Sequence, residues 1–288
     1  MKSKVYFCKD LRPETVVNMY RLLGKTLTGR VAIKVHSGEE GNPNFLRPAF
    51  WKPTVDLVGG TIVECNTAYA GARNTTARHI ALLKKHGWSD MYPVDLLDAD
   101  GPDMVLDILG GKMIKKNFVG KNLANYDAAL VLSHFKGHPM GGFGGALKQL
   151  AIGFASSYGK GYIHGVGDPK HFWDRDQDQF LEAMADAASS VVQYFNGNTV
   201  YINVMKNLSI DCDCCDASAH LPCMEDIGIL ISLDPVAIDQ ACVDLVYAST
   251  DPGKSELIER IESRHGIHTL EAAEALGIGS REYELIGV

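Results

Sequence analysis

Histidine, lysine and glycine crowd into one short segment of this 288-residue chain, residues 133–148 (SHFKGHPMGGFGGALK). The segment directly follows an apolar run at residues 128–132, which is typical of a buried strand. His134, His138 and Lys148 carry groups that can move protons or hold a cofactor. The segment therefore predicts a functional loop at the end of a strand, with these three side chains as its candidate catalytic groups.

The glycines of this loop precede a predicted helix at residues 146–154, and Lys148 lies in its first turn. Glycines allow a backbone to approach a ligand closely, and a helix N-terminus attracts anions. The sequence contains no Gly-Lys-Ser/Thr, so the loop is not a P-loop. We predict an anion- or cofactor-binding loop formed by Lys148 and four glycines: Gly141, Gly142, Gly144 and Gly145.

Three more polar loops follow predicted strands, at residues 36–47, 66–78 and 206–223. In parallel α/β sheets, ligands bind at the carboxyl ends of strands, so we expect all four loops to share one cleft. Arg47 and Arg73 are candidate anion clamps, because a guanidinium can bind a carboxylate or phosphate through two parallel hydrogen bonds. The alternatives are a surface turn with a solvated charge pair for the loop that Arg47 follows, and a surface arginine for Arg73.

Four of the seven cysteines lie between residues 212 and 223, among carboxylates. Dense thiols can bind zinc, iron or an iron–sulfur cluster, so the candidate metal ligands are Cys212, Cys214, Cys215 and Cys223. Their spacing differs from paired C-x2-C motifs, which leaves redox thiols or a structural turn as alternatives. Residues 158–173 read as a long polar loop, and long loops are often functional.

Segments typical of strands and helices alternate along the chain. This order predicts an α/β fold with a mostly parallel sheet and helices on both faces. One domain over residues 1–288 is expected, and two lobes, 1–125 and 126–288, around a cleft are the alternative. The predicted strands are 4–8, 30–35, 61–65, 112–119, 128–133, 199–205, 227–232 and 284–288, and the predicted helices are 13–23, 47–58, 75–85, 177–195, 235–247, 254–264 and 269–276.

Asp234 precedes a proline at the start of one predicted helix and is typical of an N-cap. Asp239 follows about one turn later. It is either a structural carboxylate or a partner for a histidine or lysine of the cleft.

The amino-acid composition indicates which kinds of molecule the protein binds. The chain is 46% hydrophobic and 22% charged, with a net charge of −7. An acidic chain is a poor match to nucleic acid, whereas a small anion needs only a local positive site. No apolar run is long enough for a membrane span, and the first residues do not resemble a signal peptide. We therefore expect a cytoplasmic protein with a small-molecule anionic substrate and no nucleic-acid or membrane partner.

The chain resembles a bacterial and archaeal family, domain of unknown function 362, over nearly its whole length. The matching segments are Val31–Asn42, Arg47–Phe50, Ser133–Gly153, Asp211–Cys214 and Asp226–Asp244. Many relatives carry a ferredoxin-like insertion and are described as iron–sulfur proteins. The repeated C-x2-C-x2-C-x3-C-P runs of that insertion do not occur here, so the resemblance implies an iron–sulfur cluster only weakly.

A fainter resemblance is to lactate racemase-like enzymes, whose lysine holds a nickel-pincer nucleotide. Here His138 lies ten residues before Lys148, and His164 lies sixteen residues after it, in similar order and spacing. The resemblance implies that Lys148 contacts a cofactor, that His164 is a metal ligand and that His138 moves a proton.

Two hypotheses follow. The first is a metal- or metallocofactor-dependent enzyme, of oxidoreductase or isomerase type, that carries out redox or proton-transfer chemistry on a small anionic substrate. The second is a non-catalytic iron–sulfur or metal carrier centred on the cysteines, working with a redox partner. Either protein would be compatible with a homo-oligomer.

Overall fold

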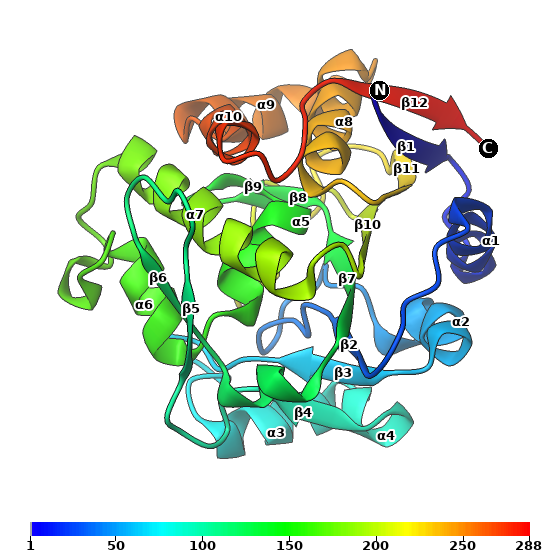
Figure 1. The fold of residues 1–288 in the computed structure, drawn as a ribbon. Helices are drawn as coiled ribbons and strands as arrows, with labels where there is room; N and C mark the ends of the chain where they lie inside the picture. Colours follow the sequence, from blue (N-terminus) through cyan, green and yellow to red (C-terminus); the bar gives the residue numbers. More distant parts are fainter. Residues whose placement is uncertain (1) are drawn as a thin grey trace.

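An eight-stranded sheet runs through the computed structural model, which describes residues 2–288 (Figure 1). Its strand order is β12-β1-β11-β10-β7-β2-β3-β4. Every pairing is parallel except the two that β11 makes, with β1 and with β10. The prediction of a mostly parallel α/β sheet is therefore confirmed. The strands are β1 (Ser3–Cys8), β2 (Val31–Lys34), β3 (Thr61–Glu64), β4 (Val94–Leu96), β7 (Ala128–His134), β10 (Thr199–Met205), β11 (Gly228–Ser232) and β12 (Tyr283–Gly287).

Helices cover both faces of this sheet, with α1 and α2 on one side and α7 and α8 on the other (Figure 1). Two small hairpins, outside the main sheet, pair β5 (Met104–Asp107) with β6 (Lys116–Val119), and β8 (Lys136–His138) with β9 (Gly142–Gly144). The helices are α1 (Pro13–Leu23), α2 (Pro48–Val58), α3 (Thr76–Lys85), α4 (Trp88–Met91), α5 (Ala146–Lys148), α6 (Ser157–His164), α7 (Gln177–Phe195), α8 (Pro235–Ala248), α9 (Lys254–Ser263) and α10 (Ile267–Ala275).

Side chains of the central strand β7 divide the apolar core into two layers. Ala129 and Val131 pack on the side of α7 and α8, whereas Leu130 and Leu132 pack on the side of α1 and α2. This alternation follows from the period of two in a strand. Because both faces of β7 are buried, its sequence is a continuous apolar run.

Strands from both sides of residue 125 belong to the same sheet. Lys34 of β2 pairs with Val131 of β7, for example, in a parallel register. The two segments 1–125 and 126–288 therefore share a continuous sheet, and the polar loops at its carboxyl ends come from both of them.

Two local predictions were wrong, and a third was confirmed with a difference in helix type. The predicted strand at 112–119 is only the short β6, which pairs with β5 outside the main sheet. The predicted loop at 158–173 contains α6, whose glycine-rich sequence hides a helix capped by Ser156 Oγ, which accepts from the Gly159 N–H. The predicted helix at 146–154 is confirmed, but only its first turn, α5, is an α-helix, and a π-helical turn, Gln149–Gly153, follows. Such π-turns are frequent at functional sites.

A carboxylate of the chain itself caps α5. The backbone N–H groups of Ala146 and Leu147 donate to the two oxygens of Asp239, at 2.7 and 2.9 Å, and Asn203 donates to the same side chain. A Cβ at Gly145 would lie 2.3 Å from an Asp239 oxygen, so glycine is needed there. Asp239 thus joins α8 to α5, and the structural alternative predicted for it is confirmed.

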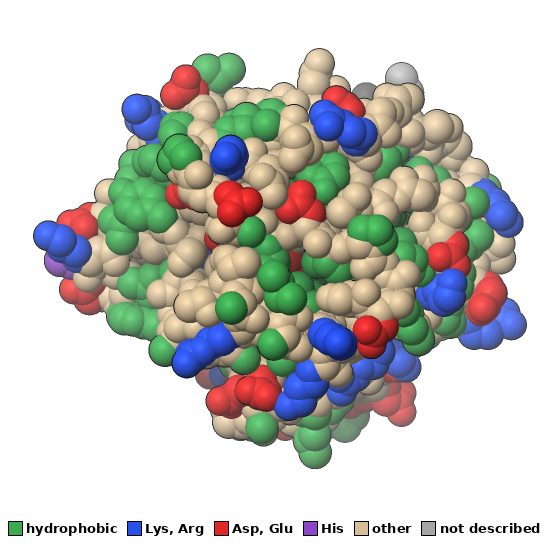
Figure 2. Space-filling view, turned by 90° about the horizontal axis from the view of Figure 1, so that it is seen from below, with side chains coloured by type: hydrophobic (Ala, Val, Ile, Leu, Met, Phe, Trp, Pro, Cys, Tyr) green, Lys and Arg blue, Asp and Glu red, His purple; other side chains and the backbone are tan. Residues whose placement is uncertain are grey.

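Acidic and basic side chains are interspersed on the face shown in Figure 2, and neither charge dominates it. Among the helices that the structure describes, none is both long enough and apolar enough to cross a bilayer.

Replacing Asp239 by Asn should have a pH-dependent cost. Burial raises the pKa of Asp239 from its ordinary 3.8 to about 6. A carboxyl raised in this way stabilises the fold most below pH 3.8, and that contribution is lost as the pH rises through 6. The free-energy cost of Asp239→Asn, measured by urea unfolding, should therefore shrink by up to about 3 kcal/mol between pH 4 and pH 7. A cost that stays constant over this range would contradict the assignment.

Candidate active site

A cavity of about 300 Å³ lies at the carboxyl ends of the parallel strands. Each of the four polar loops contributes to its wall, with His36 after β2, Arg73 after β3, His138 after β7 and Cys214 after β10. The predicted convergence on one cleft is confirmed. The wall also contains Lys34, Glu64, Cys65, Thr67, Ala68, Tyr69, Pro139, Met140, Lys148, Gln149, Ile152, Gly153, Lys160, His164, Phe172, Trp173 and Cys215.

Asp213 anchors the cysteine loop beneath this cavity. Its carboxylate lies 2.9 Å from His134 Nδ1 and accepts from Lys136 Nζ at 2.7 Å, with 1% of the residue exposed. Burial opposes ionisation, but the charges of His134 and Lys136 outweigh it and hold the pKa of Asp213 below its usual range. His134 Nε2 lies 2.5 Å from the Lys206 carbonyl, so both ring nitrogens face acceptors. His134 therefore fixes the loop, and it is not part of the cavity wall.

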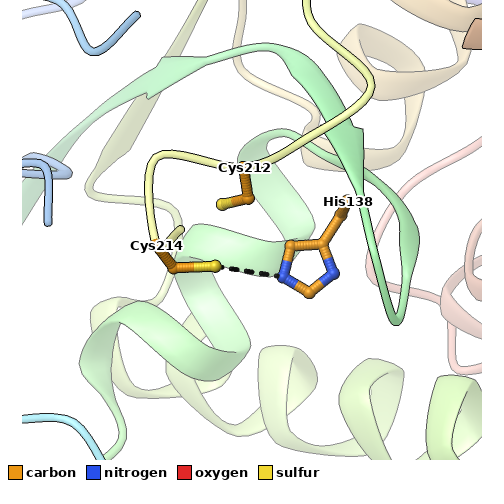
Figure 3. A group of neighbouring side chains, drawn as sticks. All are labelled: His138, Cys212 and Cys214. Carbon is orange, nitrogen blue, oxygen red and sulfur yellow. Dashed lines mark hydrogen bonds between the residues drawn. The ribbon is translucent and has the colours of Figure 1, made fainter. Parts of the chain in front are cut away.

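Three possible metal-ligating atoms meet next to this anchor. The nearest ligand atoms of His138, Cys212 and Cys214 all lie within 4.8 Å of one another (Figure 3). The Sγ of Cys214 is 3.7 Å from Nε2 of His138, and Lys148 Nζ is 3.1 Å from the Sγ of Cys212. His138 comes from the β8 hairpin, and both cysteines come from the loop after β10.

The surroundings of Cys212 favour the thiolate form of its side chain. Burial raises the pKa of its thiol, but hydrogen bonding from Cys214 and the charges of Lys148 and Lys136 outweigh burial and lower it well below its ordinary value. The Lys148 pKa is raised in turn, because the charge of Cys212 outweighs the effect of burial. The two side chains therefore favour each other's charged form across the 3.1 Å contact.

The tautomer of His138 is set by the backbone. Its Nδ1 accepts from the N–H groups of Met140 and Gly141, at 3.1 and 2.9 Å. An acceptor at Nδ1 requires that the ring proton be on Nε2, toward Cys214. Burial, followed by the charge of Lys148, lowers the pKa of His138 to about 4, so the ring is neutral at pH 7. His138 therefore presents an N–H group, and not a lone pair, at Nε2.

His164 has the opposite tautomer. Its Nδ1 is 2.7 Å from the backbone carbonyl of Lys160, which accepts the ring proton and leaves a lone pair at Nε2. The ring stacks between Phe172 and Phe180, at centroid distances of 4.3 and 4.9 Å. Burial lowers its pKa to about 3, so this ring is also neutral. Two neutral histidines of opposite tautomer thus share one cavity.

A third histidine was not among the predicted site residues. His36 accepts from the Gly38 N–H through Nδ1 and lines the cavity. Burial lowers its pKa to about 4. Its position directly after a predicted strand was the signal that could have identified it. Asp213 was missed too, although the alternating Asp-Cys-Asp-Cys pattern places it between the two cysteines.

The predicted arginines lie in different surroundings. Arg73 lines the cavity, but its Nε donates to Glu39 at 3.1 Å, and both side chains are buried. Arg47 is exposed, with its guanidinium 3.9 Å from the centroid of the Phe45 ring, and it is not part of the cavity wall. The arrangement brings only Arg73 to the cavity.

The other two cysteines lie outside the three-ligand group. Cys215 lines the cavity beside Cys214. Cys223 is removed from the cavity wall, and its Sγ donates to the Leu208 carbonyl at 3.3 Å. The structure therefore does not place all four cysteines around a common point.

The glycines of residues 141–145 have protein neighbours. Gly142 has a φ of 78°, a conformation that favours glycine, and packs against Gly266. A Cβ at Gly144 would touch the Lys148 side chain at 3.3 Å, and Gly145 packs against Asp239. Gly141 donates to His138. Binding of a cofactor by this loop stays a prediction.

The sequence matches the family described as Domain of unknown function (DUF362) over residues 31–244, and the chain belongs to that family. The family predicted from the sequence is confirmed. No curated protein matches the chain.

Solved structures similar to this chain include the lactate racemase apoprotein from Thermoanaerobacterium thermosaccharolyticum, at 12% identity and a TM-score of 0.44. That match covers 84% of this chain and 56% of the racemase. A structural-genomics crystal structure of a protein from Thermotoga maritima matches at 10% identity and a TM-score of 0.47, over 91% of this chain and 58% of the other. This chain spans a little over half the length of each.

The Arg73–Glu39 pair makes a prediction about stability. Removing one partner of a buried pair leaves an uncompensated charge, so Arg73→Met should lower the free energy of unfolding by about 3–5 kcal/mol. The exposed Lys85–Glu40 pair is the control, since Lys85→Met should cost about 1 kcal/mol or less. Urea unfolding measures both. If Arg73→Met is as mild as the control, Arg73 is free to bind a ligand anion.

Proposed function

We propose that this protein is a metal- or metallocofactor-dependent enzyme that carries out redox or proton-transfer chemistry on a small anionic substrate. The observation that carries the proposal is the pair of neutral histidines in the cavity. His164 offers a nitrogen lone pair, and His138 offers an N–H group. A site that uses one histidine as a metal ligand and another as a hydrogen-bond donor requires these two tautomers.

The donor atoms fit a metal. His164 has the tautomer of a metal ligand, with its other nitrogen donating to a backbone carbonyl. Cys212 and Cys214 offer sulfur, which zinc and other soft transition metals prefer, and their ligand atoms group with that of His138 and not with that of His164. His138 is the weakest ligand candidate, because its Nε2 carries the ring proton. The cofactor would be a metal ion, an iron–sulfur cluster or a nickel-pincer-type nucleotide, and when bound it would supply Lewis acidity or a redox centre.

His138 and Lys148 act on the substrate and the cofactor. The Nε2–H of a neutral, buried imidazole stabilises negative charge that develops on a substrate oxygen. Beside it, the ammonium of Lys148 and the thiolate of Cys212 are 3.1 Å apart and can hold or release a proton. Lys148 is also the residue that we propose to contact the cofactor, in line with the resemblance of the sequence.

The second candidate function is a metal or iron–sulfur carrier. The observation that favours it is the approach of Cys212 and Cys214 to each other, in a loop that Asp213 holds rigidly. Cys223 would not take part in such a site without a change of position.

Metal content separates the two functions. If the protein is an enzyme, His164→Ala should lose most of the bound metal and the activity, because it removes the lone-pair donor. If the protein is a carrier, Cys212→Ser should cause the largest loss of bound metal.

Lys148→Ala should abolish retention of a bound cofactor. Elemental analysis and visible spectra of anaerobically purified protein measure these outcomes.

The control is His171→Ala, an exposed histidine of the neighbouring segment that does not line the cavity. It should keep the wild-type metal content. If His164→Ala and Lys148→Ala both retain full metal and activity, the enzyme proposal fails.

A further inference from the structure

Lys160 is a buried lysine of the cavity wall, and among the described residues no carboxylate lies within ion-pair distance of it. It is 7% exposed, and among the described residues it forms no ion pair. The other cations of the cavity wall each face an anion: Lys34 with Glu64 at 2.5 Å, Arg73 with Glu39 at 3.1 Å, and Lys148 with the Cys212 sulfur at 3.1 Å. Lys160 is therefore the exception in a wall whose charges are otherwise paired.

The ammonium of Lys160 has spare hydrogen-bonding capacity. Its Nζ donates to the Ala155 carbonyl at 2.6 Å, whereas an ammonium has three N–H groups. Burial lowers the pKa of Lys160, because a charge buried without a counter-ion is costly, and an anion bound beside the amine would stabilise its charged form. The side chain lines the same cavity as His164, which follows one helical turn later on α6.

We infer that Lys160 binds the anionic group of the substrate, and that the substrate is a small carboxylate with one negative charge and an apolar body. A single lysine without a counter-ion matches a ligand with one negative charge, whereas a phosphate dianion would leave one negative charge without a partner. The wall of the same cavity includes the apolar side chains of Ile152, Met140 and Phe172, which suit an alkyl group. The cavity volume of about 300 Å³ limits the size. This inference rests on the proposed function, because it assigns the substrate of the same site.

Binding of matched probes tests the charge requirement. Isobutyrate and isobutyramide have the same shape and differ in charge, and inorganic phosphate tests the dianion. By calorimetry or ligand-observed NMR, the wild-type protein should bind isobutyrate about tenfold or more tightly than either other probe. Lys160→Met should weaken isobutyrate binding by a similar factor, whereas the exposed-site control Lys170→Met should bind it as the wild type does.

Thermal stability separates a binding role from a structural one. Lys160→Met removes an uncompensated buried charge, so its Tm without ligand should equal or exceed that of the wild type. Isobutyrate should raise the Tm of the wild type and not that of Lys160→Met.

Three results would overturn the inference: no isobutyrate binding by the wild type, tighter binding of phosphate, or unchanged isobutyrate binding by Lys160→Met. Metal retention is measured independently through His164→Ala. A failure of the anion site can thus be distinguished from a failure of the metal site.

Discussion

The candidate site depends on the ion pairs of one buried carboxylate, Asp213. Its oxygens bind His134 and Lys136 at the end of β7 and the start of β8, and its backbone carbonyl accepts from the N–H of Glu39 in the loop after β2. Three strand ends are therefore tied to one residue. Because Asp213 is flanked on both sides by the cysteines of the cluster, the same bonds that satisfy its charge fix the sulfur positions. Loss of either partner would leave the buried carboxylate with fewer hydrogen bonds and weaken its hold on the loop.

Burial and nearby positive charge explain why the cavity histidines are neutral. His138 and His164 are buried, and the nearby positive charge of Lys148 further lowers the pKa of each. The backbone then selects the tautomer, because two N–H groups face Nδ1 of His138 and a carbonyl faces Nδ1 of His164. Local backbone geometry thus leaves an N–H group at Nε2 of His138 and a lone pair at Nε2 of His164.

The sequence correctly predicted the features that follow from hydrophobic periodicity and from the tendency of ligand-binding loops to lie at the carboxyl ends of parallel strands. The apolar run at 128–132 had to be a doubly buried strand, and the loops after parallel strands had to meet. The sequence could not show which partner each charge takes. Arg73 read as free, because Glu39 lies 34 residues earlier in the sequence and meets it only through the pairing of β2 with β3. In the same way, α6 read as a loop because glycine and histidine lower helix propensity, whereas burial of its apolar face overrides it.

The capping of α5 by Asp239 also limits how the cavity can recognise an anion. A free helix N-terminus would offer backbone N–H groups and a partial positive charge to any ligand. Here Asp239 takes the first N–H groups, so the positive potential of the cavity must come from side chains. Side-chain cations can be neutralised one by one, and Glu64, Glu39 and the Cys212 thiolate do so. On the inference drawn for Lys160, selectivity for an anion would be set by the lysine that has no counter-ion, and not by the helix dipole.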